Sequence, residues 1–326
     1  MSHGNRVELL AGAPVLVVGD VMLDHYIYGA VQRISPEAPI PVLSVKRETR
    51  MLGGAGNVAR NLHALGAHVH CLSIAGDDAA GDTIAQLLDE MPDAEHRLVR
   101  EPGRRSTVKT RYVAQGQQLL RADSETVAGV SDEAWDALLT TFCEWLPRCR
   151  AVLLSDYAKG VLSGARAGSL LELTREAGIP SVVDPKGHDF QRYAQATVIK
   201  PNLRELSDAT RMSVESSEAI DRAARHLLQE CACEYILVTR GGDGMTLVGR
   251  AGPPVHWPSQ AREVFDVSGA GDTVAATLAA ALAARLTLEE AVALANCAAG
   301  VVVGKLGTAT ATREELRAAV SGIASS

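Results

Sequence analysis

Residues 266–272 combine small residues with a carboxylate in an order that suits phosphoryl transfer. The segment reads DVSGAGD, and an apolar run that predicts a helix follows it. The first backbone N–H groups of a helix lack intrahelical partners and attract anions, so Gly269, Ala270 and Gly271 are expected to form an anion hole for phosphate. Asp272 is the expected catalytic base for the attacking hydroxyl. Taken alone, the segment fits a glycine-rich turn with a capping aspartate equally well.

Residues 200–205, with the sequence KPNLRE, offer groups for a metal nucleotide. Glu205 is expected to hold Mg²⁺ through a water molecule, and Asn202 to reach nucleotide phosphates. Lys200 is expected to lie along the phosphates. The same spacing also fits a helix with Asn202 as its N-cap and Glu205 as the capping-box partner, and without other segments this is the simpler interpretation.

Residues 238–244 and 52–57 are two further glycine-rich segments. The first, VTRGGDG, presents Thr239 and Gly241 either as a shelf for a nucleotide or as a plain hairpin. The second, LGGAGN, places Gly53 and Gly54 before a predicted helix, where a ligand can approach the backbone, and Asn57 can bind sugar hydroxyls.

Two carboxylates follow the first predicted strand. Asp20 and Asp24 offer acceptors for vicinal hydroxyls, although each one alone also fits a turn. The segment GDVMLD is not a G-x-G-x-x-G sequence, which disfavours a dinucleotide site.

The elements that must position these residues alternate along the chain. Short apolar runs predict buried parallel strands at residues 15–18, 152–154, 182–183, 198–199 and 236–238. Helical patterns lie between them, among them helices expected from near Ala55, after Ser131 and after Thr287, where Glu290 completes a capping box. This order predicts an α/β fold whose ligands bind at the carboxyl ends of the strands.

Two stretches, at about residues 22–48 and 104–122, alternate as strands with one solvated face do. We expect them to form a small β-sheet inserted into one domain that spans residues 1–326.

Composition excludes several classes of function. The 326 residues are 47% hydrophobic with a net charge of −7 and no basic run, which disfavours nucleic-acid binding. No apolar run is long enough for a membrane span and the N-terminus lacks a signal pattern, so we expect a cytoplasmic protein. The six scattered cysteines indicate reduced thiols rather than a metal site.

Taken together and in this order, the motifs resemble those of the ribokinase or PfkB family of sugar kinases, over nearly the whole chain. The resemblance implies a central, mostly parallel sheet flanked by helices, with a small β-sheet lid. It also implies ATP with Mg²⁺ as the phosphoryl donor and a role for Asn296 near the adenine. A monovalent cation is a further property of some members.

The segments GDVMLD, RISPEAP, LSDYAKG, DPKG and VGKLGT narrow the resemblance to the heptose-phosphate kinases of this family. They imply phosphorylation of the anomeric hydroxyl of D-glycero-β-D-manno-heptose 7-phosphate to the 1,7-bisphosphate, a step of ADP-heptose synthesis for lipopolysaccharide. We expect a stand-alone kinase and a homodimer formed through the lid strands. The substrate residues implied by the resemblance, and the cations expected for its 7-phosphate, are Asp20, Asp24, Gly53, Gly54, Asn57, Lys109, Arg111, Arg121, Lys159, Asp184 and Lys186.

Two alternatives remain at the level of sequence. One is another kinase of this family, acting on fructose phosphate, ribose or a nucleoside. The other is a non-catalytic nucleotide or sugar sensor on the same fold, which the combination of Asp272, the glycines and Glu205 disfavours.

Overall fold

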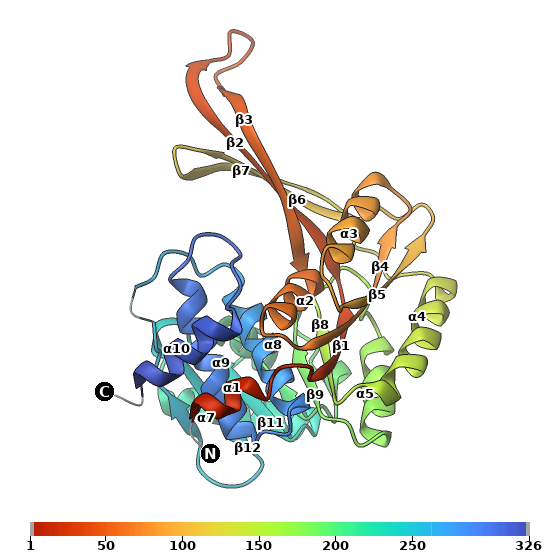
Figure 1. Ribbon diagram of the computed structural model, residues 1–326, viewed down its shortest axis with the longest axis vertical. Coiled ribbons are helices and arrows are strands. Elements are labelled where there is room, and N and C mark those ends of the chain that lie inside the picture. The colour runs from red at the N-terminus through yellow and green to blue at the C-terminus, as the bar shows by residue number, and fades with distance from the viewer. Residues whose placement is uncertain (1–2, 262, 324–326) are drawn as a thin grey trace.

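The computed structural model describes residues 3–261 and 263–323, which form a large sheet covered by helices on both faces and a second sheet that projects from this body (Figure 1). Within these residues the large sheet has the strand order β13-β12-β11-β10-β9-β8-β1-β4-β5. The neighbouring strands from β5 to β11 in this order pair in parallel. β12 pairs antiparallel with β11, and β13 pairs antiparallel with β12. Their bounds are Pro14–Gly19 (β1), His68–Gly76 (β4), Glu95–Glu101 (β5), Ala151–Ser155 (β8), Ser181–Asp184 (β9), Val198–Ile199 (β10), Tyr235–Thr239 (β11), Met245–Gly249 (β12) and Val255–Trp257 (β13).

Helices cover both faces because the central strands are apolar on both sides. In β1, Val15 and Val17 face one core, and Leu16 and Val18 face the other. The first core is covered by α1 (His3–Glu8), α2 (Ala55–Ala64), α3 (Ala79–Asp89), α8 (Ala270–Ala283), α9 (Leu288–Val303) and α10 (Arg313–Ile323). The second is covered by α4 (Asp132–Trp145), α5 (Arg166–Glu176), α6 (Leu203–Thr210) and α7 (Ser217–Cys231). Short 3₁₀ turns are Leu146–Arg148 (η1), Gln191–Tyr193 (η2) and Gly241–Asp243 (η3).

The expected α/β architecture is therefore confirmed, with its five buried strands as β1, β8, β9, β10 and β11. The helix starts are confirmed as well. The Ser131 side chain accepts a hydrogen bond from a backbone N–H of α4, and Thr287 and Glu290 form a complete capping box on α9. The cysteines are all unpaired thiols, and Cys143 alone among them is exposed.

The second sheet has the order β3-β2-β6-β7, with bounds Val21–Ile34 (β2), Pro41–Gly54 (β3), Thr107–Ala114 (β6) and Gln117–Ser124 (β7). The β2–β3 hairpin extends away from the helices (Figure 1). These strands lie in the two stretches that were expected to form it, but β3 continues to Gly54 and runs directly into α2. Gly53 and Gly54, which were expected directly before a helix, are the last two residues of this strand. In addition, β2 pairs in parallel with β6, which hairpins alone would not produce.

The carboxyl ends of β1, β8, β9 and β10 meet at one edge of the large sheet. A polar residue lies at each of these strand ends. Asp20, Asp156 and Lys200 directly follow β1, β8 and β10, and Asp184 is the last residue of β9. Among the described helices, none is both long and apolar enough to span a bilayer.

The contact between β1 and β8 leaves no space for a side chain at Gly19. A Cβ atom added there would lie 1.9 Å from the carbonyl oxygen of Ser155. At Gly168 in α5, the nearest atom would be the Arg192 carbonyl oxygen at 3.6 Å, which is ordinary contact.

We predict that Gly19→Ala lowers the free energy of unfolding by about 1–3 kcal/mol, because the clash involves backbone that must shift. The matched control, Gly168→Ala, should raise it by about 0.5–1 kcal/mol, because alanine loses less backbone entropy in a helix. Chemical denaturation of both variants checks this. An unchanged midpoint for Gly19→Ala would contradict the packing of these two strands.

Candidate active site

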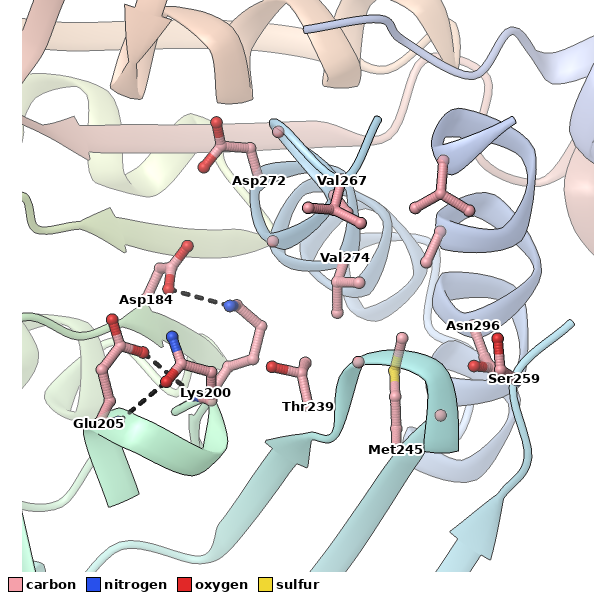
Figure 2. A pocket seen from close by; sticks show the side chains of 18 of the residues that line it. Asp184, Lys200, Glu205, Thr239, Met245, Ser259, Val267, Asp272, Val274 and Asn296 are labelled. Atoms are coloured by element: carbon pink, nitrogen blue, oxygen red, sulfur yellow. Dashed lines mark hydrogen bonds and ion pairs between the residues drawn. The ribbon is translucent and has the colours of Figure 1, made fainter. Parts of the chain in front are cut away.

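A cavity of about 620 Å³ opens at the carboxyl ends of the central strands. It brings together residues from four motifs that are far apart in the sequence. Those of the predicted site residues that line it are Asp184, Lys186, Lys200, Asn202, Glu205, Thr239, Gly241, Gly269, Ala270, Gly271, Asp272 and Asn296. Asp272 lies at one end of this cavity, and Asn296 lies at the other, beside Ser259 (Figure 2).

The Asp272 carboxylate lies in the first turn of α8 and is held by two donors. Its Oδ2 accepts a hydrogen bond from Asn57 Nδ2 at 2.6 Å, and its Oδ1 accepts one from the Tyr157 hydroxyl. The residue is only 7% exposed. This burial raises the pKa of Asp272, although both hydrogen bonds and the charge of Lys200 act in the opposite direction. A carboxylate fixed in this way is suited to accepting a proton.

The Asn57 amide is itself oriented. Its oxygen accepts a hydrogen bond from Arg60 Nη1 at 3.2 Å, which directs its nitrogen toward Asp272. One turn further along α2, Asn61 Oδ1 accepts a hydrogen bond at 2.7 Å from Oγ1 of Thr273, the residue after Asp272, so polar contacts join α2 to α8 within the core. Asn57 was predicted to contact a sugar, and the structure places it directly against the predicted catalytic carboxylate.

Tyr157 was not among the predicted site residues. It follows β8, and the loop that carries it is held by Asp20. The Asp20 carboxylate, 1% exposed, accepts hydrogen bonds from the backbone N–H groups of Tyr157, Lys159 and Val161 at 2.9–3.0 Å. The structure thus gives Asp20 the task of positioning this loop, where the sequence had suggested a sugar contact. The aspartate at the end of β8, Asp156, and the quoted segment LSDYAKG were the available signals.

Gly53 and Gly54 are required by close packing around Asp20, which lies between β1 and β2, and Asp24 on β2. A Cβ at Gly54 would lie 2.3 Å from the Asp20 carbonyl oxygen, and one at Gly53 would lie 2.5 Å from Asp24 Oδ2. Gly54 also has a φ of 57°, a conformation that favours glycine. Both glycines therefore let β3 approach these residues before α2 begins.

The predicted anion hole stands at the start of α8. Gly269 is the N-cap with a φ of 80°, and a Cβ there would lie 3.1 Å from Asn57 Nδ2. The Lys200 ammonium lies beside the same helix start, 3.6 Å from where a Cβ of Gly271 would be. The Ala270 N–H donates to the Val267 carbonyl oxygen at 3.3 Å. The positive end of the α8 dipole and the buried ammonium together make this end of the cavity favourable for an anion.

Lys200 is buried and pairs with Asp184, Nζ to Oδ1, at 2.9 Å (Figure 2). Burial raises the pKa of Asp184 to about 6, against the effect of the Lys200 charge. Burial alone would lower the pKa of Lys200, but Asp184 outweighs it and the pKa is raised, so this ammonium stays charged.

Asn202 and Glu205 form the capping box of α6, and both side chains still line the cavity. Both interpretations of this segment therefore apply at once. The second oxygen of Glu205 pairs with Lys186 Nζ at 3.0 Å. Lys186 was expected to bind the sugar phosphate, but because β9 and β10 are neighbouring strands, the structure places it beside Glu205 instead.

The 238–244 segment is likewise both a hairpin and part of the cavity wall. β11 and β12 pair antiparallel, and the η3 turn between them presents Gly241 next to Thr239. Across from it, Asn296 on α9 donates to the Pro258 carbonyl oxygen at 2.8 Å, which fixes the segment that carries Ser259.

The remaining predicted cations lie on or next to one face of the second sheet. Lys109 and Arg111 are two residues apart on β6, so their side chains point to the same face of the sheet, and Arg121 on β7 pairs with Arg111. Arg111 pairs with Asp24 at 2.6 Å, and its neighbours Arg121 and Lys159 pair with Asp123 and Glu125.

Lys109 makes no ion pair within the described part of the chain, and its ammonium lies 5.6 Å from the centre of the Tyr157 ring. Burial lowers the pKa of Lys109, and the nearby charges of Lys159, Arg111 and Arg121 lower it further, against the effect of Asp24. These cations are thus close enough to repel one another, which an anionic ligand would relieve.

The family model described as pfkB family carbohydrate kinase matches residues 13–315. The chain is 54% identical, over 95% of its length, to the "Bifunctional protein HldE" of Paramagnetospirillum magneticum, and 49% identical over 96% to that of Rhodospirillum rubrum. It spans 64% and 63% of the length of these two relatives.

Solved structures agree on the fold. Arabidopsis thaliana ribokinase complexed with ribose and ATP has a TM-score of 0.75 at 22% identity, covering 94% of this chain and 98% of that one. Phosphofructokinase-2 from Escherichia coli in complex with potassium has a TM-score of 0.79 at 19% identity, covering 95% and 99%. The family match over most of the chain, on this fold, shows that the chain belongs to the pfkB family of carbohydrate kinases.

Proposed function

We propose that this chain transfers the γ-phosphoryl group of ATP to the anomeric hydroxyl of D-glycero-β-D-manno-heptose 7-phosphate, giving the 1,7-bisphosphate. The observation that carries the proposal is the position of the buried Asp272 carboxylate in the first turn of α8. The cavity lies on one side of this carboxylate, and the second sheet with its cations lies on the other. A kinase that acts on a sugar already bearing a phosphate needs both an anion site for ATP and a second one for its acceptor.

The nucleotide is assigned to the cavity. Thr239, Gly241 and Asn296 line it, and Asn296 lies at the end away from Asp272, where the base and ribose would lie (Figure 2). The phosphates would extend toward Lys200 and the α8 start, with Lys186 as a further cation. The acceptor is assigned to the space between Asp272 and the second sheet, with Asp24 and Asn57 toward its hydroxyls and Lys109, Arg111, Arg121 and Lys159 toward its phosphate.

In the proposed reaction the anomeric O–H gives its proton to Asp272, and its oxygen attacks the γ-phosphorus in line with the leaving ADP oxygen. One P–O bond forms as the other breaks, and ADP carries away the electron pair. The N–H groups of Gly269, Ala270 and Gly271 together with Lys200 stabilise the charge that develops on the γ-phosphoryl oxygens.

The donor set of the cavity fits Mg²⁺, because the carboxylates of Asp184 and Glu205 are hard oxygen ligands and no thiolate is among the residues that line it within the described chain. Glu205 would hold the ion through a water molecule, since both its oxygens already accept protein hydrogen bonds. Bound with ATP, Mg²⁺ supplies charge neutralisation of the phosphates. A monovalent cation remains a prediction from the family.

The second sheet is proposed to serve as a lid and as the contact of a homodimer. Its exposed apolar side chains are Ile34, Ile40, Val45, Leu119 and Leu120. Exposed apolar side chains on strands with free edges favour pairing with a second copy of the chain.

A substrate panel with ADP detection tests the proposal. Among heptose 7-phosphate, fructose 6-phosphate, ribose and a nucleoside, we expect heptose 7-phosphate to give the highest kcat/KM. A clear preference for another acceptor would refute the substrate.

The Asp272→Asn variant tests the catalytic base. We expect it to lower kcat by roughly 10²- to 10⁴-fold while ATP still binds. ATP binding without ADP release for every acceptor, or an active Asp272→Asn variant, would refute the kinase mechanism.

Lys109→Gln should lower kcat/KM for the sugar phosphate by roughly 10- to 100-fold, because a charge-assisted contact to phosphate is lost. Arg50→Gln is the matched control, since Arg50 is on the same sheet but opposite His25, on the other face. Activity with heptose that lacks the 7-phosphate should not change in either variant. An equal loss with both sugars would contradict a role of Lys109 in binding phosphate.

Tyr157→Phe tests how Asp272 is positioned. The hydroxyl donates to the charged carboxylate, so its removal should raise the already raised pKa of Asp272 further. Because only ionised Asp272 accepts a proton, the acid limb of the kcat profile should lie at higher pH than in the unmodified protein. Tyr28→Phe, on the second sheet, is the control. Superimposable profiles for Tyr157→Phe and the unmodified protein would contradict this role.

A further inference from the structure

Three side chains of types that can bind metals lie beside β5, the last strand at one side of the large sheet and away from the cavity (Figure 1). His68 and His70 point to the same face of β4, and Glu95 on β5 is directly opposite His70. The Nε2 atoms of His68 and His70 lie 4.0 and 3.9 Å from Glu95 Oε1. All three potential ligand atoms lie within 4.8 Å of one another.

The His70 side chain, 1% exposed, has a buried Nε2 with no hydrogen-bond partner within the described chain. Its other nitrogen, Nδ1, lies 3.7 Å from the Cys149 thiol, and the ring packs edge-on against Trp145. A buried ring nitrogen without a partner is unfavourable, and it faces Glu95 and His68.

From this geometry we propose that His68, His70 and Glu95 bind one divalent transition-metal ion of the Zn²⁺ type, with water at a fourth position. Two imidazoles and a carboxylate are a ligand set that zinc accepts, whereas Mg²⁺ prefers oxygen alone. Bonds of about 2.0–2.2 Å need ligand atoms about 3.3–3.5 Å apart. The partly exposed side chains of His68 and Glu95 can rotate to close this difference around the fixed His70.

The titratable and charged groups that face His70 are Glu95, His68 and Arg148. Burial lowers the pKa of His70 to about 4, against the effect of Glu95. Arg148 pairs with the same Glu95 oxygen that the metal would use, and its side chain is 47% exposed. The metal and Arg148 therefore compete for Glu95, and Arg148 can move into solvent when the metal binds.

The metal would link β4 to the edge strand β5. In the sheet order, β1 and β4 lie between β5 and the strands that line the cavity. The bound ion should thus raise thermal stability without changing the turnover of the kinase reaction.

Zinc titration by calorimetry tests the proposal, with the full chain, no histidine tag and no nucleotide. The unmodified protein should bind one Zn²⁺ at this site, His68→Asn should bind it at least about tenfold more weakly, and Arg148→Gln should bind it more tightly. His226→Asn is the matched control, because His226 and Glu230 form an exposed pair at the same 3.9 Å on α7. It should bind zinc like the unmodified protein, and millimolar Mg²⁺ should not compete.

Thermal melting gives a second readout, in which Zn²⁺ raises the Tm of the unmodified protein and of His226→Asn but not of His68→Asn. Two results would overturn the proposal. One is the absence of zinc binding to the unmodified protein. The other is equal affinity in His68→Asn, which would place the bound ion elsewhere, for example on the cavity carboxylates.

Discussion

A buried carboxylate must be satisfied by donors, and at Asp272 these donors come from two segments far away in the sequence. Asn57 lies in the first turn of α2, and Tyr157 is in the loop after β8. The loop of Tyr157 depends in turn on Asp20, whose oxygens accept three of its backbone N–H groups. The helix start, the loop and the end of β1 are thus joined through polar contacts that all serve to hold one carboxylate.

The charged side chains near Asp272 form two groups, one in the cavity and one on the second sheet. Toward the cavity, carboxylates and ammonium groups balance in pairs, Asp184 with Lys200 and Glu205 with Lys186, which suits a nucleotide that brings its own metal ion. Toward the second sheet, Lys109 stands near three other cations without an ion pair of its own in the described chain. This unbalanced positive charge is the physical reason to assign an acceptor that carries a phosphate.

The second sheet is connected directly to the elements that form the site. β2 follows the end of β1 after Asp20, and β3 leads into α2 through Gly54. Asp24, which pairs with Arg111, lies where the sheet leaves the body, and Lys109 approaches Tyr157 from it. A displacement of the sheet would therefore change the contacts around the acceptor while Asp272 stays fixed on α8.

The sequence by itself determined the alternation of buried strands and helices, the helix starts and the motifs around Asp272, because these depend on local periodicity, capping and glycine spacing. Twelve of the predicted site residues line the cavity, since parallel strands end at one edge, whereas Asp20, Asp24, Gly53, Gly54 and Asn57 are not in its lining. The sequence did not reveal Tyr157, the loop-holding task of Asp20 or the pairing of Lys186 with Glu205. Those depend on which strand ends are neighbours and on where a side chain finds a partner, and only the tertiary structure decides both.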